Sequence, residues 1–563
     1  MPQRARLLLV ALFVPLALQA QSALPPKHPP QPTVAAITAG DLATRLYIFS
    51  DDSMQGREAG TAGNVKGTAY IAAELKRLGL VPGGDDGTYF QTIPLKTRTL
   101  DTTSTLAVAG TPLKAFTDYL ALGPEPLERS TLASVYGGEL GDSAARLTPG
   151  LASGKLVVLR VPGGTSPRRM LRAVSVPGAA AVALVALDSF PRPFVAFLKR
   201  PRVFLDDGRG VAPAQPPAFL ITSAVAAKLF ATPLDQLALG TAGASVASAV
   251  RFNVLALADP ARNVVGIIPG SDPKLRGEYV AVGAHNDHLG FAHPPVDHDS
   301  IRIWNHVVRP EGADDAAKQA TPEQQARVDS LLALFRATHP GAARVDSVDN
   351  GADDDGSGSV AALEIAEHIA SLSRKPKRSI VFVWHTGEEK GLLGSRFFTD
   401  HPSVPRDSIV AQLNMDMVGR GSASDETGRT KEGVALHGGP RYLQLVGSRR
   451  LSTELGDLIE RVNAQGGHGL SFDYAIDADG HPSNIYCRSD HYEYARYGIP
   501  ITFFTTGLHS DYHQVTDEPQ YIDYEHMARV ATFVDDVAVH VANLDHRLVV
   551  DHPRPDPAAP CRQ

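Results

Sequence analysis

The chain has 563 residues, which is too many for a single hydrophobic core and predicts two or three domains. Hydrophobic residues make up 43% and charged residues 20%, as in an ordinary globular protein. The net charge of −7, from 54 basic and 61 acidic residues, gives no sign of a nucleic-acid partner.

Residues 1–20 are typical of a secretory signal peptide. Arg4 and Arg6 precede an apolar stretch that begins at Leu7 and ends near Ala20. The stretch is shorter than the roughly 20 apolar residues that a bilayer span requires. A membrane anchor is the alternative interpretation. We expect an exported protein, periplasmic or secreted, with no membrane span.

The next segments differ in composition. Residues 21–35 are rich in proline and are interpreted as a linker. Residues 36–111 are expected to be the N-terminal part of an α/β catalytic domain, with a helix over 66–78. From 112 to 255, short strand-like runs alternate with Pro/Gly turns, which predicts an inserted β-rich domain.

Strands and helices alternate over residues 256–545, which predicts a doubly wound α/β fold with a mixed sheet. Four apolar runs lead directly into polar motifs. Because open α/β sheets place their sites beyond the carboxyl ends of the strands, these motifs are expected to converge. The runs are 279–282, 380–384, 409–413 and 501–504. The Pro-rich residues 546–563 form a tail.

Five short motifs carry the acidic and imidazole side chains. They are residues 284–288, 351–358, 387–389, 414–417 and 511–513. Carboxylate and imidazole ligands without cysteine suit zinc, manganese or cobalt. Each motif alone is more often a turn or a surface pair. The five in order, each after a strand or before a helix, predict a two-metal hydrolase.

The chemistry requires one carboxylate that bridges the metals, terminal ligands for each metal, and a separate base. We assign Asp354 as the bridge. His285 and Asp416 would complete one metal site, and Glu389 and His513 the other. Because Glu388 is not needed as a ligand, it is the expected general base. Asp287 is expected to accept the second imidazole proton of His285.

Residues 291–350 do not fit a compact connection in an α/β domain. Thr321-Pro322-Glu323-Gln324 predicts a helix start with a capping box. Two interpretations stay open, a surface helix packed on the sheet and a lid or wall over the metal site. The segment Glu311–Asp315 is similar to the bridging motif but lacks its Ser-Gly, so we do not expect it to bind the metals.

Cys487 and Cys561 are the two cysteines of the chain. In an exported protein they could form a disulfide, and two free thiols are the alternative. Neither pattern indicates a thiolate metal site.

The motifs resemble those of the zinc-dependent exopeptidase family that includes bacterial leucyl aminopeptidases and glutamate carboxypeptidase II. The resemblance rests on residues 284–290, 350–358, 387–395, 414–419, 489–491 and 511–513, with residues 54–57 near the start. It implies two Zn²⁺ per chain, peptide substrates, and an oxyanion-stabilising role for Tyr512. It also implies that residues 112–255 are a protease-associated domain.

The resemblance leads us to expect an aminopeptidase. Carboxypeptidase or dipeptidase activity is the first alternative within the family. A glutaminyl-cyclase-type acyltransferase with one zinc is a second, and a receptor-like protein with a dead site is a third. The retention of both His285 and Asp416 argues against the second, and the complete ligand set against the third. The sequence does not indicate the residue cleaved or the oligomeric state.

Overall fold

The structure is a computed structural model that describes residues 28–563 apart from 124, 142–146, 164, 166–175, 191–194, 197, 209–215, 316–318, 342, 422–438 and 440. The expected signal peptide, residues 1–20, and residues 21–27 of the linker lie outside the described residues. Among the described helices, none has the length and hydropathy needed to cross a bilayer.

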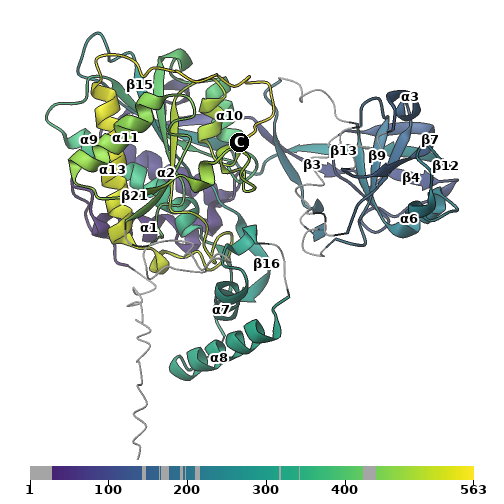
Figure 1. Ribbon diagram of the computed structural model, residues 1–563. Helices are drawn as coiled ribbons and strands as arrows, with labels where there is room; N and C mark the ends of the chain where they lie inside the picture. Colours follow the sequence, from purple (N-terminus) through teal and green to yellow (C-terminus); the bar gives the residue numbers. More distant parts are fainter. Residues whose placement is uncertain are drawn as a thin grey trace, which may run out of the picture.

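A nine-stranded mixed sheet forms the centre of the larger body in Figure 1. Its core is a run of four parallel strands in the order β18-β15-β19-β22. These strands are β18 (Ser379–His385), β15 (Tyr279–His285), β19 (Ile409–Met415) and β22 (Ile501–Thr505). Every residue of these four strands is buried except Tyr279, the first residue of β15. This is expected for strands that are covered on both faces of the sheet.

Antiparallel strands extend both edges of this parallel core. On one side, β14 pairs with β18 and also with β1 and β2. On the other side, β20 pairs antiparallel with β22 and parallel with β21. Their bounds are β1 Val81–Pro82, β2 Phe90–Ile93, β14 Ala261–Ile268, β20 Tyr442–Val446 and β21 Ser471–Asp473. The expected α/β fold with a mixed sheet is therefore confirmed.

Helices cover both faces of the sheet. The larger apolar cluster lies between the sheet and helices that include α1, α2, α9, α11 and α13. The opposite face is covered by α10 and α12. The bounds are α1 Ala39–Phe49, α2 Ala62–Arg77, α9 Gly358–Ser371, α10 Leu393–Asp400, α11 Thr453–Gly466, α12 His491–Ala495 and α13 Tyr524–Asn543. The helix expected over 66–78 is the C-terminal part of α2 and the first residue beyond it.

A separate eight-stranded sheet has the order β5-β4-β12-β7-β8-β9-β11-β6 and lies apart from the larger body (Figure 1). Its strands are β4 Thr105–Val108, β5 Thr111–Pro112, β6 Tyr119–Ala121, β7 Leu127–Glu139, β8 Leu156–Arg160, β9 Ala181–Val185, β11 Ala218–Ile221 and β12 Ala242–Val250. This body is β-rich, as expected, although β4 begins before residue 112. A small sheet of β10, β3 and β13 lies between the two bodies (Arg202–Leu205, Leu95–Leu100 and Phe252–Ala256).

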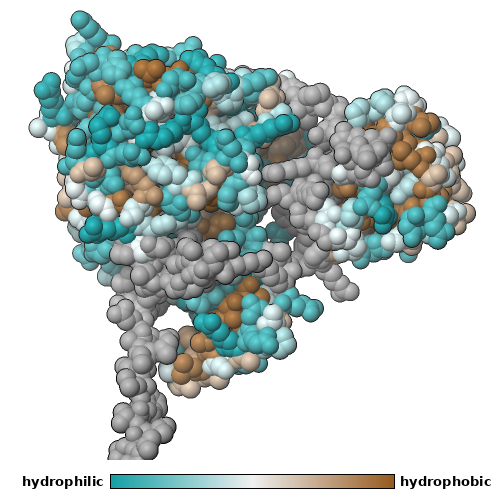
Figure 2. Space-filling view, viewed as in Figure 1, coloured by the Kyte–Doolittle hydropathy of each residue, from teal (hydrophilic) through white to brown (hydrophobic). Residues whose placement is uncertain are grey.

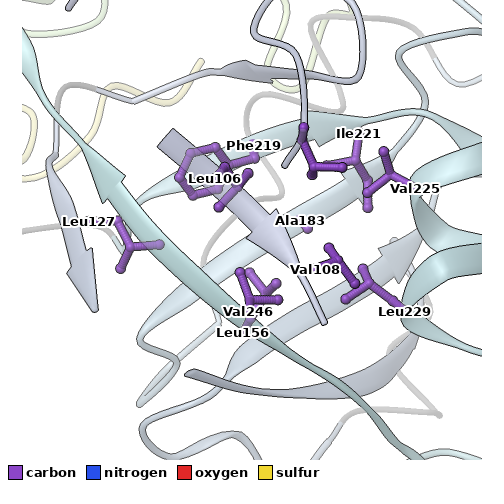
Figure 3. Close-up of a pocket in the computed structure, with 11 residues that line it drawn as sticks. Leu106, Val108, Leu127, Leu156, Ala183, Phe219, Ile221, Val225, Leu229 and Val246 are labelled. Carbon is purple, nitrogen blue, oxygen red and sulfur yellow. The ribbon is translucent and has the colours of Figure 1, made fainter. Parts of the chain in front are cut away.

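The interior of the eight-stranded body holds an apolar cavity. The side chains drawn in Figure 3, among them Leu106, Leu156 and Phe219, converge from several strands and from helix α6 (Ser223–Leu229). Every lining residue is apolar. None of the described residues there can bind a charged substrate or transfer a proton, so we interpret the cavity as part of the hydrophobic core.

The segment 291–350 forms a structure of its own. It leaves the sheet through β16 (Gly290–Asp297) and returns through the antiparallel β17 (Val345–Asp349). Between them lie α7 (His298–Val308), a short 3-10 turn (Gly312–Asp314) and α8 (Pro322–Thr338). The capping box at Thr321 and Gln324 is present, as the sequence predicted.

Helix α8 packs against α7 instead of the large sheet. Only Val328 of this helix is fully buried, and Leu334 is 52% exposed. Apolar side chains are accordingly visible on this part of the surface in Figure 2. Of the two sequence interpretations, the surface helix packed on the sheet is therefore wrong in its partner, because α8 packs against α7.

Candidate metal centre

The predicted ligands meet at one edge of the parallel core. His285 is the last residue of β15, Glu389 follows β18, Asp416 follows β19, and His513 lies in the loop after β22. Asp354 comes from the segment between β17 and α9. The parallel strands end at the same edge of the sheet, so side chains from five separate parts of the chain come together there.

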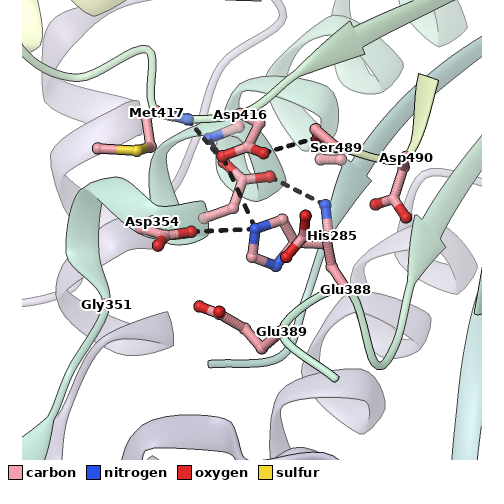
Figure 4. Close-up of polar contacts among 12 residues, drawn as sticks. His285, Gly351, Asp354, Glu388, Glu389, Asp416, Met417, Ser489 and Asp490 are labelled. Carbon is pink, nitrogen blue, oxygen red and sulfur yellow. Dashed lines mark hydrogen bonds and ion pairs between the residues drawn. The ribbon is translucent and has the colours of Figure 1, made fainter. Parts of the chain in front are cut away.

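Asp354 contacts two of the predicted ligands, and its contact with the imidazole of His285 is drawn in Figure 4. Its Oδ1 is 3.0 Å from Nε2 of His285, and its Oδ2 is 3.0 Å from Nε2 of His513. His285 Nε2 also lies 3.7 Å from Oδ1 of Asp416, and His513 Nε2 lies 3.1 Å from Oε2 of Glu389. The two oxygens of one carboxylate thus face two different sets of ligands.

Charge in this cluster is balanced between imidazoles and carboxylates. Burial alone would lower the pKa of His513, but Glu389 and Asp354 raise that pKa to about 10. Burial alone would raise the pKa of Asp354, but His285 and His513 hold it well below its usual value. In the metal-free protein the protonated histidines therefore supply the positive charge that the carboxylates require.

These residues fit divalent metals. Ligand atoms of His285, Asp354 and Asp416 lie within 4.8 Å of one another, as do those of His288, Asp354 and Glu389. Nε2 of His285 and Oε1 of Glu389 are buried and have no hydrogen-bond partner of acceptable geometry. Such unsatisfied buried atoms, together with the nitrogen and oxygen donor set, match the coordination that zinc uses in proteins.

His288 is a site residue that the sequence analysis did not assign. Its Nδ1 lies 2.9 Å from Oε1 of Glu389 and 3.9 Å from Oδ2 of Asp354. It is fully buried, and its ring meets that of His513 edge-on. The sequence did offer one indication that His288 belongs to the site, because it lies three residues after His285 in the same motif. Glu389 is thus held between two imidazoles.

Glu388 and Asp287 were predicted to act in catalysis. Glu388 lines a cleft with Asp354 and Asp416, and burial raises its pKa well above the usual value. The Asp287 carboxylate accepts hydrogen bonds from the backbone of Gly387 and Glu388, at 2.7 and 3.2 Å. It therefore fixes the loop that carries the proposed base.

The contact between Asp287 and His285 differs from the expected one. Nδ1 of His285 lies 3.0 Å from the backbone carbonyl oxygen of Asp287 and 3.8 Å from the Oδ1 atom of its carboxylate. The carbonyl is therefore the closer partner of the imidazole. A tight turn after β15 brings that carbonyl back to the ring, which residue spacing alone does not reveal.

Tyr512 stacks on the neighbouring His513, with ring centroids 3.9 Å apart. Its hydroxyl lies 3.4 Å from a guanidinium nitrogen of Arg488. Burial raises the pKa of Tyr512 well above its usual value, so the phenol keeps its proton and can donate a hydrogen bond. Tyr512, Arg488 and Ser489 line the same cleft as Glu388.

Two buried residues outside the predicted set hold the ligand loops. Arg57 donates to the carbonyl oxygens of Phe49, Asn286, Asn350 and Gly351 at 2.7–3.2 Å. Ser489 donates to Oδ2 of Asp416 at 2.7 Å. The family resemblance included residues 54–57 and 489–491, but it did not reveal what Arg57 and Ser489 contact, because their partners lie far away in the sequence.

Part of the chain is similar to a known peptidase family. Residues 329–538 match the model of peptidase family M28. Over this part of the chain, the match confirms the resemblance to a peptidase family that the motifs indicated.

Relatives of known description are similar over parts of the chain. Leucine aminopeptidase 1 of Trichophyton rubrum is 26% identical over 193 residues, which cover 33% of this chain and 46% of that protein. A probable zinc metalloprotease of Pyrenophora tritici-repentis is 42% identical over 77 residues, 14% of this chain and 17% of that protein. The chain thus spans about half, or less, of the length of these relatives.

Among solved structures, an aminopeptidase from Aneurinibacillus sp. strain AM-1 is similar over 92% of this chain and 97% of its own. Its TM-score is 0.49 and its sequence identity is 19%.

Proposed function

We propose that the protein is a co-catalytic di-zinc aminopeptidase that removes N-terminal residues from peptides. The observation that supports this most is the position of Asp354 between two ligand sets. His285 and Asp416 would hold one zinc, and Glu389 and His513 the other, with His288 beside the second. When bound, the zinc pair would lower the pKa of a water molecule and polarise the scissile carbonyl.

Glu388 is the proposed general base. It lines the cleft, is adjacent in sequence to the proposed ligand Glu389, and belongs to none of the candidate metal clusters found among the described residues. It would accept a proton from the attacking water and deliver it to the amine of the leaving group. Its neighbour Asp287 holds the backbone at residues 387 and 388, so the carboxylate is presented in a fixed position.

Tyr512 is the proposed donor to the oxyanion that forms at the attacked carbonyl. Because the phenol keeps its proton, it can donate a hydrogen bond as negative charge develops. Arg488 lies 3.4 Å from the phenol oxygen and adds positive charge on the same side.

We infer which end of the peptide is cleaved from the charges of the residues that line the cleft. Three carboxylates, those of Asp354, Glu388 and Asp416, line it together with Arg488 and His513, and a cleft with this many carboxylates suits the α-ammonium of an N-terminal residue. Apolar side chains including Met417, Ile485 and Phe503 form the remaining wall and suit an apolar side chain.

The protein is also proposed to be exported. Cys487 and Cys561 form a disulfide, which settles the two alternatives left open by the sequence and agrees with an oxidising compartment. The apolar segment over residues 1–20 remains the predicted export signal.

The test is hydrolysis by the zinc-loaded protein of leucine amide and of N-acetyl-leucine amide, each with and without a chelator. The proposal predicts hydrolysis of the free amine only, with loss of activity in the chelator. N-acetyl-leucyl-leucine, a blocked peptide with a free C-terminal residue, is assayed alongside, and activity on it without activity on leucine amide would instead support a carboxypeptidase.

A further inference from the structure

The turn Gly312–Asp314, in the insertion 291–350, packs directly against the loop that carries Tyr512 and His513. The backbone nitrogen of Ala313 donates to the carbonyl oxygen of Tyr512 at 3.1 Å. Gly312 has φ +57, and a Cβ there would lie 2.6 Å from the Tyr512 oxygen and 2.8 Å from that of His509. Only glycine allows this approach, so the turn is shaped to fit the ligand loop.

Asp314 reaches from this turn to the cleft. Its two carboxylate oxygens lie 3.0 and 3.1 Å from the two terminal nitrogens of Arg488, a bidentate pair. Both side chains are 17% exposed, so water screens the pair only in part. One of the same Arg488 nitrogens lies 3.4 Å from the hydroxyl of Tyr512. Asp314 thus contacts a residue that contacts the proposed oxyanion donor.

Arg488 is the one arginine among the described residues that line the cleft. Arginine often binds the carboxylate of a substrate through two parallel hydrogen bonds from its guanidinium. In this protein, Asp314 already accepts both of these hydrogen bonds from Arg488. A substrate carboxylate near Arg488 would have to displace Asp314, or would meet its negative charge.

We propose that Asp314 is a positioning and specificity residue, which holds Arg488 toward Tyr512 and disfavours substrates with a carboxylate close to the scissile bond. The insertion would then be a wall of the active site. Free dipeptides carry such a carboxylate, whereas longer peptides and peptide amides carry neutral amide groups in its place. This inference rests on the proposed aminopeptidase function.

The experiment compares two substrates that share a scissile bond, leucyl-glycine and leucyl-glycine amide. The zinc-loaded wild type is expected to have the higher kcat/KM for the amide. In Asp314→Asn the ratio of kcat/KM, amide over free dipeptide, is expected to fall about five- to tenfold, chiefly through a lower KM for the dipeptide. Asp329→Asn is the matched control, an exposed aspartate on α8 of the same insertion, and should keep the wild-type ratio.

Zinc content and thermal unfolding of both variants are measured alongside. If Asp314→Asn is unstable, Asp314→Ser removes the same charge with a smaller side chain and carries the same expectation. Asp314→Glu keeps the charge and should stay closer to the wild-type ratio. An unchanged ratio in a folded, zinc-loaded Asp314→Asn overturns the inference while leaving the aminopeptidase function in place. Lack of activity of the wild type on both substrates and on leucine amide would overturn the function itself.

Discussion

Nε2 of His285 lies 3.0 Å from Oδ1 of Asp354, although 69 positions separate the two residues in the sequence (354 − 285). The whole insertion 291–350 is included in that separation. Because β16 and β17 pair with each other at the base of the insertion, its two ends lie side by side. The long excursion therefore leaves the two ligands in contact, and its turn at Gly312–Asp314 reaches the cleft.

Replacement of the proposed base Glu388 should lower the rate of the reaction without removing the metals. Glu388→Gln keeps the size of the side chain but removes its ability to accept a proton. We expect kcat to fall by about two orders of magnitude or more, in line with loss of a general base. Zinc content, measured by elemental analysis, should remain near that of the wild type. Normal turnover in the zinc-loaded variant would exclude Glu388 as the base.

Replacement of the proposed bridge should affect both metals. Asp354→Asn removes the charge that faces His285 on one side and His513 on the other. We expect zinc content to fall by more than one ion per chain, together with activity. Ser489→Ala is a useful comparison, since it removes a hydrogen bond to Asp416 and one from Asn414 but no proposed ligand, and it should weaken one metal. Full zinc occupancy in Asp354→Asn would contradict the bridge.

Arg57 should be important for stability as well as for metal binding. Its guanidinium is fully buried and bonds four backbone carbonyls, three of them beside the ligands His285 and Asp354. Arg57→Met would leave these carbonyls unpaired, and we expect the free energy of unfolding to fall by about 3–5 kcal/mol. Denaturant unfolding measures this loss.

Arg461→Met serves as the control for Arg57, since Arg461 is exposed on α11. It should change the free energy of unfolding by less than about 0.5 kcal/mol. Equal, small effects of the two substitutions would show that Arg57 does not hold the ligand loops.

Zinc uptake by the metal-free protein should increase with pH. The pKa of His513 is raised to about 10, so its imidazole is protonated at neutral pH and must lose that proton to bind a metal. A raised pKa means that protons compete with zinc below pH 10, and affinity should rise between pH 6.5 and 9. Titration calorimetry in buffers with different ionisation enthalpies would detect the released protons. An affinity independent of pH would contradict this charge state.

The disulfide should stabilise the C-terminal tail. Cys487 and Cys561 are 74 positions apart, and the tail residue Gln563 bonds to the backbone of Ile476 and Tyr486. Closing a loop of that length is worth about 4 kcal/mol in the chain-entropy model. The double replacement Cys487→Ser/Cys561→Ser should lower the free energy of unfolding by about 2–4 kcal/mol, with zinc content unchanged.

Local signals predicted much of the fold and of the site. The apolar runs before residues 285, 388 and 416 are buried parallel strands, because strands covered on both faces consist of continuous hydrophobic residues. The capping box at Thr321 also predicted a helix start correctly. These features depend on residues close together in the sequence, so the sequence reveals them directly.

Long-range contacts could not be predicted in the same way. The carbonyls that Arg57 bonds lie up to 294 positions away, and Asp314 lies 174 positions from Arg488. No periodicity or spacing connects such residues. The segment Glu311–Asp315 was not expected to bind the metals, and the sequence indicated no other role for it. Its contact with Arg488 was found only in the structure.

The central claim is that one carboxylate is shared by two zinc ions. Anomalous diffraction at the zinc absorption edge, from crystals of the zinc-loaded protein, tests it most directly. The account predicts two peaks, one beside His285 and Asp416 and one beside Glu389 and His513, with Asp354 in contact with both. A single peak, or peaks away from Asp354, would contradict it.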